Sequence, residues 1–283
     1  MFDPYKDLWD RPLGGISKKN EVPHLVGNLI YGFLFVLFKL LFRFHVDGRE
    51  NLRAFYQHKG VVVVCNHTSF LDTVFLYLTA RPKQWIRLLG RESLFGNAKG
   101  LAGHILSRVG AFPVKRDSAD LTAIKRAAKM LKNAEVVGVF PEGTRRGKGT
   151  QAIELHSGAA LIARMGKAPI LPATVRNAEY IKQKGNFFRF PKVSVEYGRP
   201  VALSEFDFLP KDERLDACTW YLMRECFALS KRCKPEEIDM CTLYPDAKDY
   251  RDIFSAHPIK RCSGQEFVAA QTSLSSEENA KEA

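Results

Sequence analysis

The sequence lacks the cysteine patterns of a structural metal site or a disulfide framework. Its six cysteines include no Cys-x-x-Cys pair and no zinc-ligand spacing. Five of them fall in the C-terminal quarter, at Cys218, Cys226, Cys233, Cys241 and Cys262. No bound metal is therefore expected, and a reducing, cytosol-facing location is the simpler interpretation.

The sequence also has fewer acidic residues than basic ones. The chain carries 31 Asp and Glu against 43 Lys and Arg, which gives a formal net charge of +12. This balance favours polyanionic partners, namely nucleic acid, an anionic membrane or phosphorylated small molecules. Nucleic acid is the weakest of these, since no nucleic-acid-binding motif is present. At 283 residues, 46% of them hydrophobic, the chain is long enough for one sizeable domain with appendages.

One apolar run, Leu25–Phe42, is marginal for crossing a membrane. As a helix it would span about 27 Å at ~1.5 Å per residue, against a bilayer core of ~30 Å. Basic residues on both sides give no clear crossing direction. No small-residue cleavage site follows, so a signal peptide is not expected. We expect a helix that lies in or dips into one leaflet at the cytoplasmic face, with a buried core helix as the alternative.

Short apolar segments alternate with helical patterns through the middle of the chain. The segments "GVVVVCNH", "WIRLLG", "EVVGVF", "PILPATV" and "KVSVEYGRPV" read as strands. This order predicts an α/β fold with a mixed, largely parallel sheet flanked by helices. The expected parts are a flexible polar lead with the apolar helix at 1–44, an α/β domain at 45–203, a helical extension at 204–270 and a disordered tail at 271–283.

The segment "CNHTSFLD" sets a histidine five positions before an aspartate, directly after an apolar strand. We expect a helix to start at Thr68 or Ser69, so that Asp72 in its first turn reaches back to His67. The carboxylate would then orient the imidazole and leave its other nitrogen free to take a proton. The alternative is that Asp72 is only a favourable charge at a helix start.

A second polar segment, "VFPEGTRRGKG", follows another predicted strand. Gly143 permits close backbone approach to a ligand, and the arginines beside it are suited to binding phosphate. A solvated basic turn is the alternative. No Gly-x-Ser-x-Gly nucleophile motif occurs, and Cys65 is expected to face the core. A base without an enzyme nucleophile suits direct attack by a substrate hydroxyl.

Taken in order, these segments resemble the glycerolipid acyltransferase family, typified by 1-acyl-sn-glycerol-3-phosphate acyltransferase. Asn66, His67 and Asp72 match its Asn-His-x4-Asp motif. The segments "GRESLFG" and "GAFPVKR" match its second block, Phe140–Arg145 match Phe-Pro-Glu-Gly-Thr-Arg, and "ILPATV" matches the fourth motif. The resemblance covers about residues 45–203.

The resemblance implies a role for each matching position. His67 would be the general base, oriented by Asp72, and Pro172 would shape the acyl-binding side. The residues implied to bind the acceptor or its phosphate are Arg91, Glu142, Gly143, Thr144 and Arg145. One departure is His156, which stands where many members carry a lysine; the phosphate role of that position is therefore in doubt.

The expected reaction is transfer of an acyl chain from acyl-CoA or acyl-ACP to lysophosphatidic acid, giving phosphatidic acid, with no cofactor and at an anionic membrane surface. Two alternatives stay open at this point. One keeps the fold but uses glycerol-3-phosphate or another lysophospholipid as acceptor. The other is a non-catalytic, basic membrane-binding protein.

Overall fold

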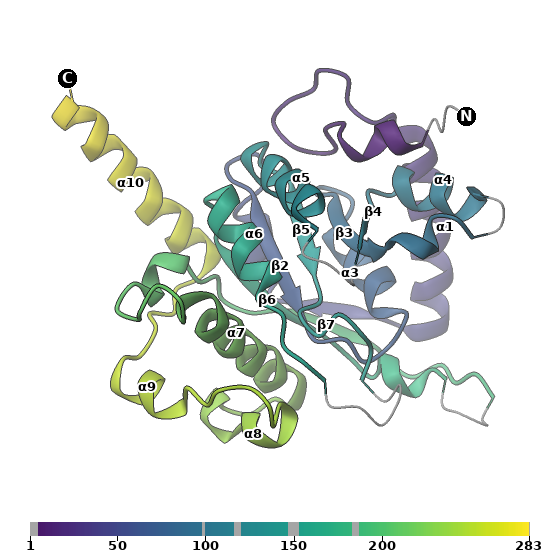
Figure 1. The fold of residues 1–283 in the computed structure, drawn as a ribbon. Helices are drawn as coiled ribbons and strands as arrows, with labels where there is room; N and C mark the ends of the chain where they lie inside the picture. Colours follow the sequence, from purple (N-terminus) through teal and green to yellow (C-terminus); the bar gives the residue numbers. More distant parts are fainter. Residues whose placement is uncertain (1–4, 98–99, 116–119, 147–152, 183–186, 283) are drawn as a thin grey trace.

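The computed structural model describes residues 5–97, 100–115, 120–146, 153–182 and 187–282. Over these residues seven strands form one sheet in the order β1-β7-β6-β2-β5-β3-β4 (Figure 1). Neighbouring strands are parallel except β6 and β7, so the predicted mixed, largely parallel sheet is confirmed. The strands are β1 (His45–Asp47), β2 (Val61–Cys65), β3 (Ile86–Arg91), β4 (Phe112–Val114), β5 (Val136–Val139), β6 (Ile170–Arg176) and β7 (Ser194–Tyr197).

The central strand β2 shows why both faces of the sheet are covered. All five of its residues are buried. Successive side chains of a strand point to opposite faces, so Val61 and Val63 belong to one apolar core and Val62 and Val64 to the other. A continuous apolar run of this kind is typical of a strand packed on both sides.

Helices supply the two covering layers. The face that Val62 and Val64 line is covered by α5 (Leu121–Lys132), α6 (Gly158–Gly166) and α7 (Arg214–Lys231), with α8 (Met240–Leu243) and α9 (Arg251–Ala256) outside them. The opposite face is covered by α1 (His24–Phe42), α2 (Arg49–Arg53), α3 (Asp72–Ala80) and part of α4 (Leu101–Arg108). Figure 1 shows α5, α6 and α7 on the other side of the sheet from α1 and α3.

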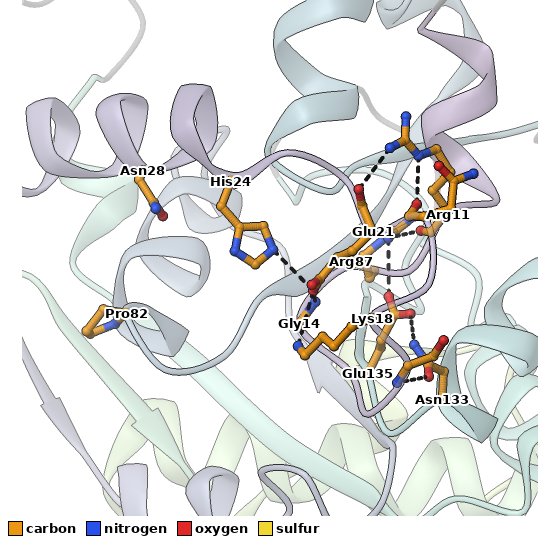
Figure 2. A network of polar contacts seen from close by, with 12 residues as sticks. Arg11, Gly14, Lys18, Glu21, His24, Asn28, Pro82, Arg87, Asn133 and Glu135 are labelled. Carbon is orange, nitrogen blue, oxygen red and sulfur yellow. Dashed lines mark hydrogen bonds and ion pairs between the residues drawn. The ribbon is translucent and has the colours of Figure 1, made fainter.

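The polar lead before α1 is held against the sheet, so the expectation of a flexible segment was wrong over its described part. Arg87, on β3, is 1% exposed and donates hydrogen bonds to the carbonyl oxygens of Trp9 (2.9 Å) and Arg11 (3.1 Å). The same guanidinium pairs with buried Glu135 at 3.2 Å (Figure 2). Asn133 donates to Glu135 and accepts from the backbone N–H of Ser17 at 2.8 Å. Local composition could not predict these contacts, because they join residues that are far apart in the sequence.

Helix α1 buries only part of its surface. Within the described residues it is the one helix whose length and composition would allow it to cross a membrane, and 17% of its 18-residue apolar window is buried. An apolar stripe stays exposed along it, formed by Leu25, Leu29, Phe33, Val36 and Leu40. The exposure excludes the alternative of a buried core helix.

Beyond α7 the chain returns across the protein before entering α10 (Gly264–Glu282). The tail predicted to be disordered after residue 271 is therefore helical as far as residue 282; residue 283 lies outside the described residues. The start of α10 is fixed by Phe267, which packs on Phe55, and by the N–H of Gly264, which donates to Asn51. Leu274 is the one large apolar residue after Gln271, and this scarcity of apolar residues did not prevent the helix from continuing.

We predict that Arg87→Leu lowers the free energy of unfolding by about 3–5 kcal/mol, because it leaves the buried Glu135 carboxylate without its cation. Urea titration measures the change. Arg91→Leu is the matched control, an exposed arginine on the same strand, and should shift stability by no more than about 0.5 kcal/mol. Equal effects of the two substitutions would contradict the role given to the ion pair.

Candidate active site

The candidate site lies at the carboxyl edge of the parallel strands. β2 pairs with β5, and β5 pairs with β3, all in the same direction. The loop that carries His67 leaves β2 beside the loop that leaves β5 at Phe140. Open α/β sheets bind ligands at this edge, because the loops that follow neighbouring strands meet there.

His67 and Asp72 form the pair that their spacing predicts. His67 Nδ1 lies 3.0 Å from Asp72 Oδ2, and Asp72 is fully buried. The same carboxylate oxygen accepts the backbone N–H groups of Thr68 (2.8 Å) and Ser69 (2.7 Å). These N–H groups belong to a turn around the carboxylate, so α3 begins at Asp72 and not at Thr68 or Ser69 as expected.

The environment of the pair favours one protonation pattern. Burial raises the pKa of Asp72, while the hydrogen bond from His67 and the backbone N–H groups oppose the rise. With Asp72 ionised, the Nδ1 of His67 carries the proton and Nε2 is left to accept one. The side chain of His67 is 13% exposed, and its ring packs on Phe140 with centroids 4.2 Å apart. The imidazole is thus held in position from two sides.

Glu142 links the loop that follows β5 to the backbone of His67 by a hydrogen bond. The His67 N–H donates to Glu142 Oε2 at 2.7 Å, and the N–H of Arg146 donates to the His67 carbonyl at 2.9 Å. The guanidinium of Arg146 contacts the other oxygen of Glu142. Glu142 is 2% exposed. The structure therefore gives Glu142 an internal role behind His67, and the part in the acceptor site that the resemblance implies for it stays a prediction.

The C-terminal extension reaches this network through Tyr244. Its hydroxyl donates to Glu142 Oε1 at 2.8 Å, and its ring lies under the Arg146 guanidinium, 4.6 Å from the centroid. Burial and the neighbouring Glu142 raise the pKa of Tyr244, so the phenol stays protonated and acts as donor. Phe227 contacts the same guanidinium at 4.8 Å.

The two adjacent arginines of the loop have opposite environments. Arg146 turns inward to Glu142, which corrects the expectation that both arginines are available to bind phosphate. Arg145 lies over the ring of Phe70, 5.7 Å from its centroid, next to the turn that holds His67. No ion pair joins Arg145 to a carboxylate in the part of the chain that the structure describes. Its charge is therefore available to a bound anion.

Gly143 has a positive φ of 59°, a conformation that favours glycine. A Cβ atom at this position would lie 3.2 Å from Cδ2 of His156, so the loop also needs a small residue here. Thr144 is exposed beside it. His156 is thus brought to the same loop as Arg145, at the position that the resemblance assigns to a cation.

Arg91 and Pro172 are less closely associated with His67. Arg91 is exposed at the last position of β3, on the same edge of the sheet. Pro172 is buried within β6, opposite Val64, one strand from the β5 loop. Neither contacts His67 through a hydrogen bond or ion pair among the described residues. The implied roles of both residues stay predictions.

Other features limit the chemistry of the site. Burial raises the pKa of the Cys65 thiol well above its usual value, and Cys65 is fully buried, so it is no nucleophile. The N–H groups of Thr68 and Ser69 are bound to Asp72, which removes them as donors to an oxyanion. Within the described ranges no cluster of three His, Cys, Asp or Glu side chains is arranged to hold a metal.

Reasoning from the sequence alone assigned Arg146 the wrong role and missed Tyr244. Arg146 had a usable signal, because it follows Glu142 by four residues, a spacing at which opposite charges often pair. Tyr244 had none, since 102 positions separate it from Glu142. Only the folded chain brings the extension to the loop.

Comparison with known proteins agrees with the fold and with the order of these motifs. Residues 43–176 match the sequence model of the Acyltransferase family. A 1-acyl-sn-glycerol-3-phosphate acyltransferase of Bacillus subtilis (strain 168) is 36% identical over 174 residues, 62% of this chain and 81% of that protein. The Streptococcus pneumoniae enzyme of the same name is 27% identical over 63% of each chain.

A solved structure shares the architecture. The crystal structure of the 1-acyl-sn-glycerophosphate (LPA) acyltransferase PlsC from Thermotoga maritima superimposes with a TM-score of 0.53 at 24% identity, and it covers 72% of this chain and 79% of that one. At this identity the likeness concerns the fold. The extended match to the Bacillus protein carries the assignment, and the resemblance predicted from the motifs is confirmed: the chain belongs to the glycerolipid acyltransferase family and is an acyltransferase.

Proposed function

We propose that the protein transfers an acyl chain from acyl-CoA or acyl-ACP to the free hydroxyl of 1-acyl-sn-glycerol-3-phosphate, forming phosphatidic acid. The observation that carries the proposal is the His67–Asp72 pair with Arg145 beside it, an arginine that makes no ion pair with a carboxylate among the described residues. A base and a fixed cation in one site suit an acceptor that carries both a hydroxyl and a phosphate. The names of the Bacillus and Streptococcus relatives support the same acceptor.

In the proposed reaction His67 Nε2 removes the proton of the acceptor hydroxyl as its oxygen attacks the thioester carbonyl. The C–S bond then breaks, and the proton on the imidazolium passes to the departing thiolate. Asp72 stays ionised and stabilises the imidazolium between these steps. Arg145 binds the acceptor phosphate and holds the hydroxyl near the base, which lowers the entropic part of the barrier.

The exposed stripe of α1 supports a position at a membrane. The stripe runs along one side of the helix, while Phe38 and Phe42 on the other side pack on α3 through Phe75. A helix with one apolar face exposed and the other bound to its protein is suited to lie within one leaflet. We place that leaflet on the cytoplasmic side, in keeping with a cysteine spacing that does not suggest a disulfide framework.

The test of the function is an acyl-transfer assay with purified protein, supplied with acyl-CoA or acyl-ACP. The acceptor panel contains lysophosphatidic acid, glycerol-3-phosphate, lysophosphatidylcholine and monoacylglycerol. We expect the largest kcat/KM for lysophosphatidic acid. A larger value for any other member would overturn the proposed acceptor while leaving the acyltransferase assignment intact.

We predict that His67→Ala lowers kcat by ~10²–10⁴-fold, the usual loss when a general base is removed. Asp72→Asn should cost less, because it misorients the base without deleting it. His58→Ala changes an exposed histidine and is the control. Circular dichroism establishes that each variant is folded. A His67→Ala enzyme within a few fold of the wild type would sink the assignment of the base.

For Arg145 and Arg146 we predict a split between KM and kcat. Arg145→Ala should raise KM for lysophosphatidic acid roughly ten- to a hundredfold, as expected for a lost charge-assisted contact of ~1.5–3 kcal/mol. Arg145→Lys should recover part of the loss. Arg146→Ala should act mainly on kcat, since it loosens Glu142 and the His67 backbone. Monoacylglycerol is the control acceptor, and an equal effect of Arg145→Ala on it would contradict a phosphate contact.

Tyr244→Phe tests the contribution of the C-terminal extension. The substitution keeps the ring under Arg146 and removes only the donor to Glu142, so we predict an approximately tenfold lower kcat with KM for the acyl thioester nearly unchanged. Tyr250→Phe alters another buried tyrosine of the extension and serves as the matched control. If both variants lost activity equally, the effect would be one of packing and not of the hydroxyl.

A further inference from the structure

A cavity lies at the beginning of α1, away from His67. Its volume is about 390 Å³. The residues that matter for its chemistry are Lys18, His24, Asn28, Arg81, Lys83 and Trp85. We call this cavity the N-terminal pocket. Figure 2 shows His24 and Asn28 on α1 with Pro82 across from them and Lys18 below.

The N-terminal pocket is separate from the candidate active site. Trp85 directly precedes β3, whereas Arg91 ends the same strand at the carboxyl edge. A six-residue strand extends about 20 Å at ~3.3 Å per residue. The pocket and His67 therefore occupy opposite edges of the sheet, and an anion in the pocket is not the acceptor of the acyl chain.

Arg81 is the most unusual residue of the pocket. It is 5% exposed, and its guanidinium lies 3.9 Å from the centroid of Trp85. The guanidinium donates to the Pro82 carbonyl at 2.8 Å and contacts Oδ1 of Asn28, while its Nε is buried with no partner among the described residues. No described carboxylate pairs with it. A buried cation without a counter-charge is costly, so the arrangement favours the arrival of an anion.

The other charges around the pocket do not supply that anion. Glu21 accepts from the N–H of Gly14 at 2.7 Å and lies 3.3 Å from Lys18 and 3.1 Å from His24. It thus already serves three partners, and it is the one carboxylate paired with the pocket's cations in the described ranges. Lys83 is exposed at the rim without such a pair. The pocket keeps an excess of positive charge.

The surface beside the pocket indicates where the anion comes from. Asn28 lines the pocket from α1, and Leu25 and Leu29 of the exposed apolar stripe flank it on the same helix. A helix whose stripe is immersed in one leaflet has its neighbouring face at the level of the lipid phosphates. Its cationic pocket then meets phosphate at the boundary between hydrocarbon and water.

We propose that the N-terminal pocket binds the phosphate group of an anionic membrane lipid, which docks the enzyme beside its substrate pool. The inference rests on the proposed position of α1 in a leaflet, but not on the identity of the acyl acceptor. The bound lipid is a non-reacting ligand, since the base is at the other edge of the sheet. Free inorganic phosphate shares the recognised chemistry and is the alternative source that the experiment separates.

The experiment measures binding of the full chain to vesicles of phosphatidylglycerol or phosphatidylcholine at about 0.15 M salt. The pocket variant is Lys18→Gln with Lys83→Gln, both exposed residues. The control removes the same charge elsewhere, as Lys211→Gln with Lys231→Gln, also exposed. We expect the pocket variant to bind phosphatidylglycerol about tenfold more weakly, to bind phosphatidylcholine as the wild type does, and the control to change by less than twofold. Equal losses in the pocket and control variants would overturn the proposal, because diffuse charge would then explain binding.

Two further arms complete the test. Leu29→Ser with Phe33→Ser should weaken binding to both lipids, since it alters the apolar stripe and leaves the charges in place. Dihexanoyl-phosphatidylglycerol should raise the melting temperature of the wild type more than of Arg81→Gln. If inorganic phosphate at the same ionic strength raised it equally, the lipid source would be overturned. Acyl transfer to a dispersed short-chain acceptor should be unchanged in the pocket variant, so failure of the acceptor assignment and failure of the pocket are distinguishable.

Discussion

The buried ion pair between Arg87 and Glu135 is the constraint on which the N-terminal half of the structure depends. Its guanidinium binds two backbone carbonyls of the lead, and through Asn133 the carboxylate is linked to a third point further along it. Because the lead is held in this way, Pro23 and the first turn of α1 have a fixed position against the sheet. The direction of the exposed stripe is therefore set by the core, although the stripe itself makes few contacts with it.

The buried carboxylate of Asp72 has a comparable organising role at the carboxyl edge of the sheet. One carboxylate oxygen accepts hydrogen bonds from the imidazole and from two backbone N–H groups, so a single buried side chain determines the turn, the start of α3 and the orientation of the His67 ring. Glu142 extends this organisation to the next strand and, through Tyr244, to the C-terminal extension. Three segments that are distant in the sequence thus build the site, and their polar groups form one hydrogen-bond network around the backbone of His67. Arg145 lies beside this network, over Phe70.

Features that depend on nearby residues were predictable from the sequence, and those that depend on distant ones were not. The strand β2, the His67–Asp72 contact and the apolar helix follow from patterns within about twenty positions. The start of α3 was misplaced because Thr68 and Ser69 form a turn around the Asp72 carboxylate that precedes the first helical residue. The inward turn of Arg146 had a local signal, the four-residue spacing from Glu142. The ordered lead and the approach of Tyr244 depend on contacts across the folded chain, which no nearby propensity or spacing reports.

The approach of Tyr244 to Glu142 also has a consequence for the order of events during synthesis. The apolar stripe of α1 is complete once Phe42 has been made, whereas the network behind His67 closes only when Tyr244 has left the ribosome. At ~5–20 residues per second the interval between the two is roughly 10–40 s. With α1 in a leaflet as proposed, a nascent chain of this kind meets the membrane surface before the network behind His67 is complete. The proposed lipid acceptor would then be within reach when that network closes.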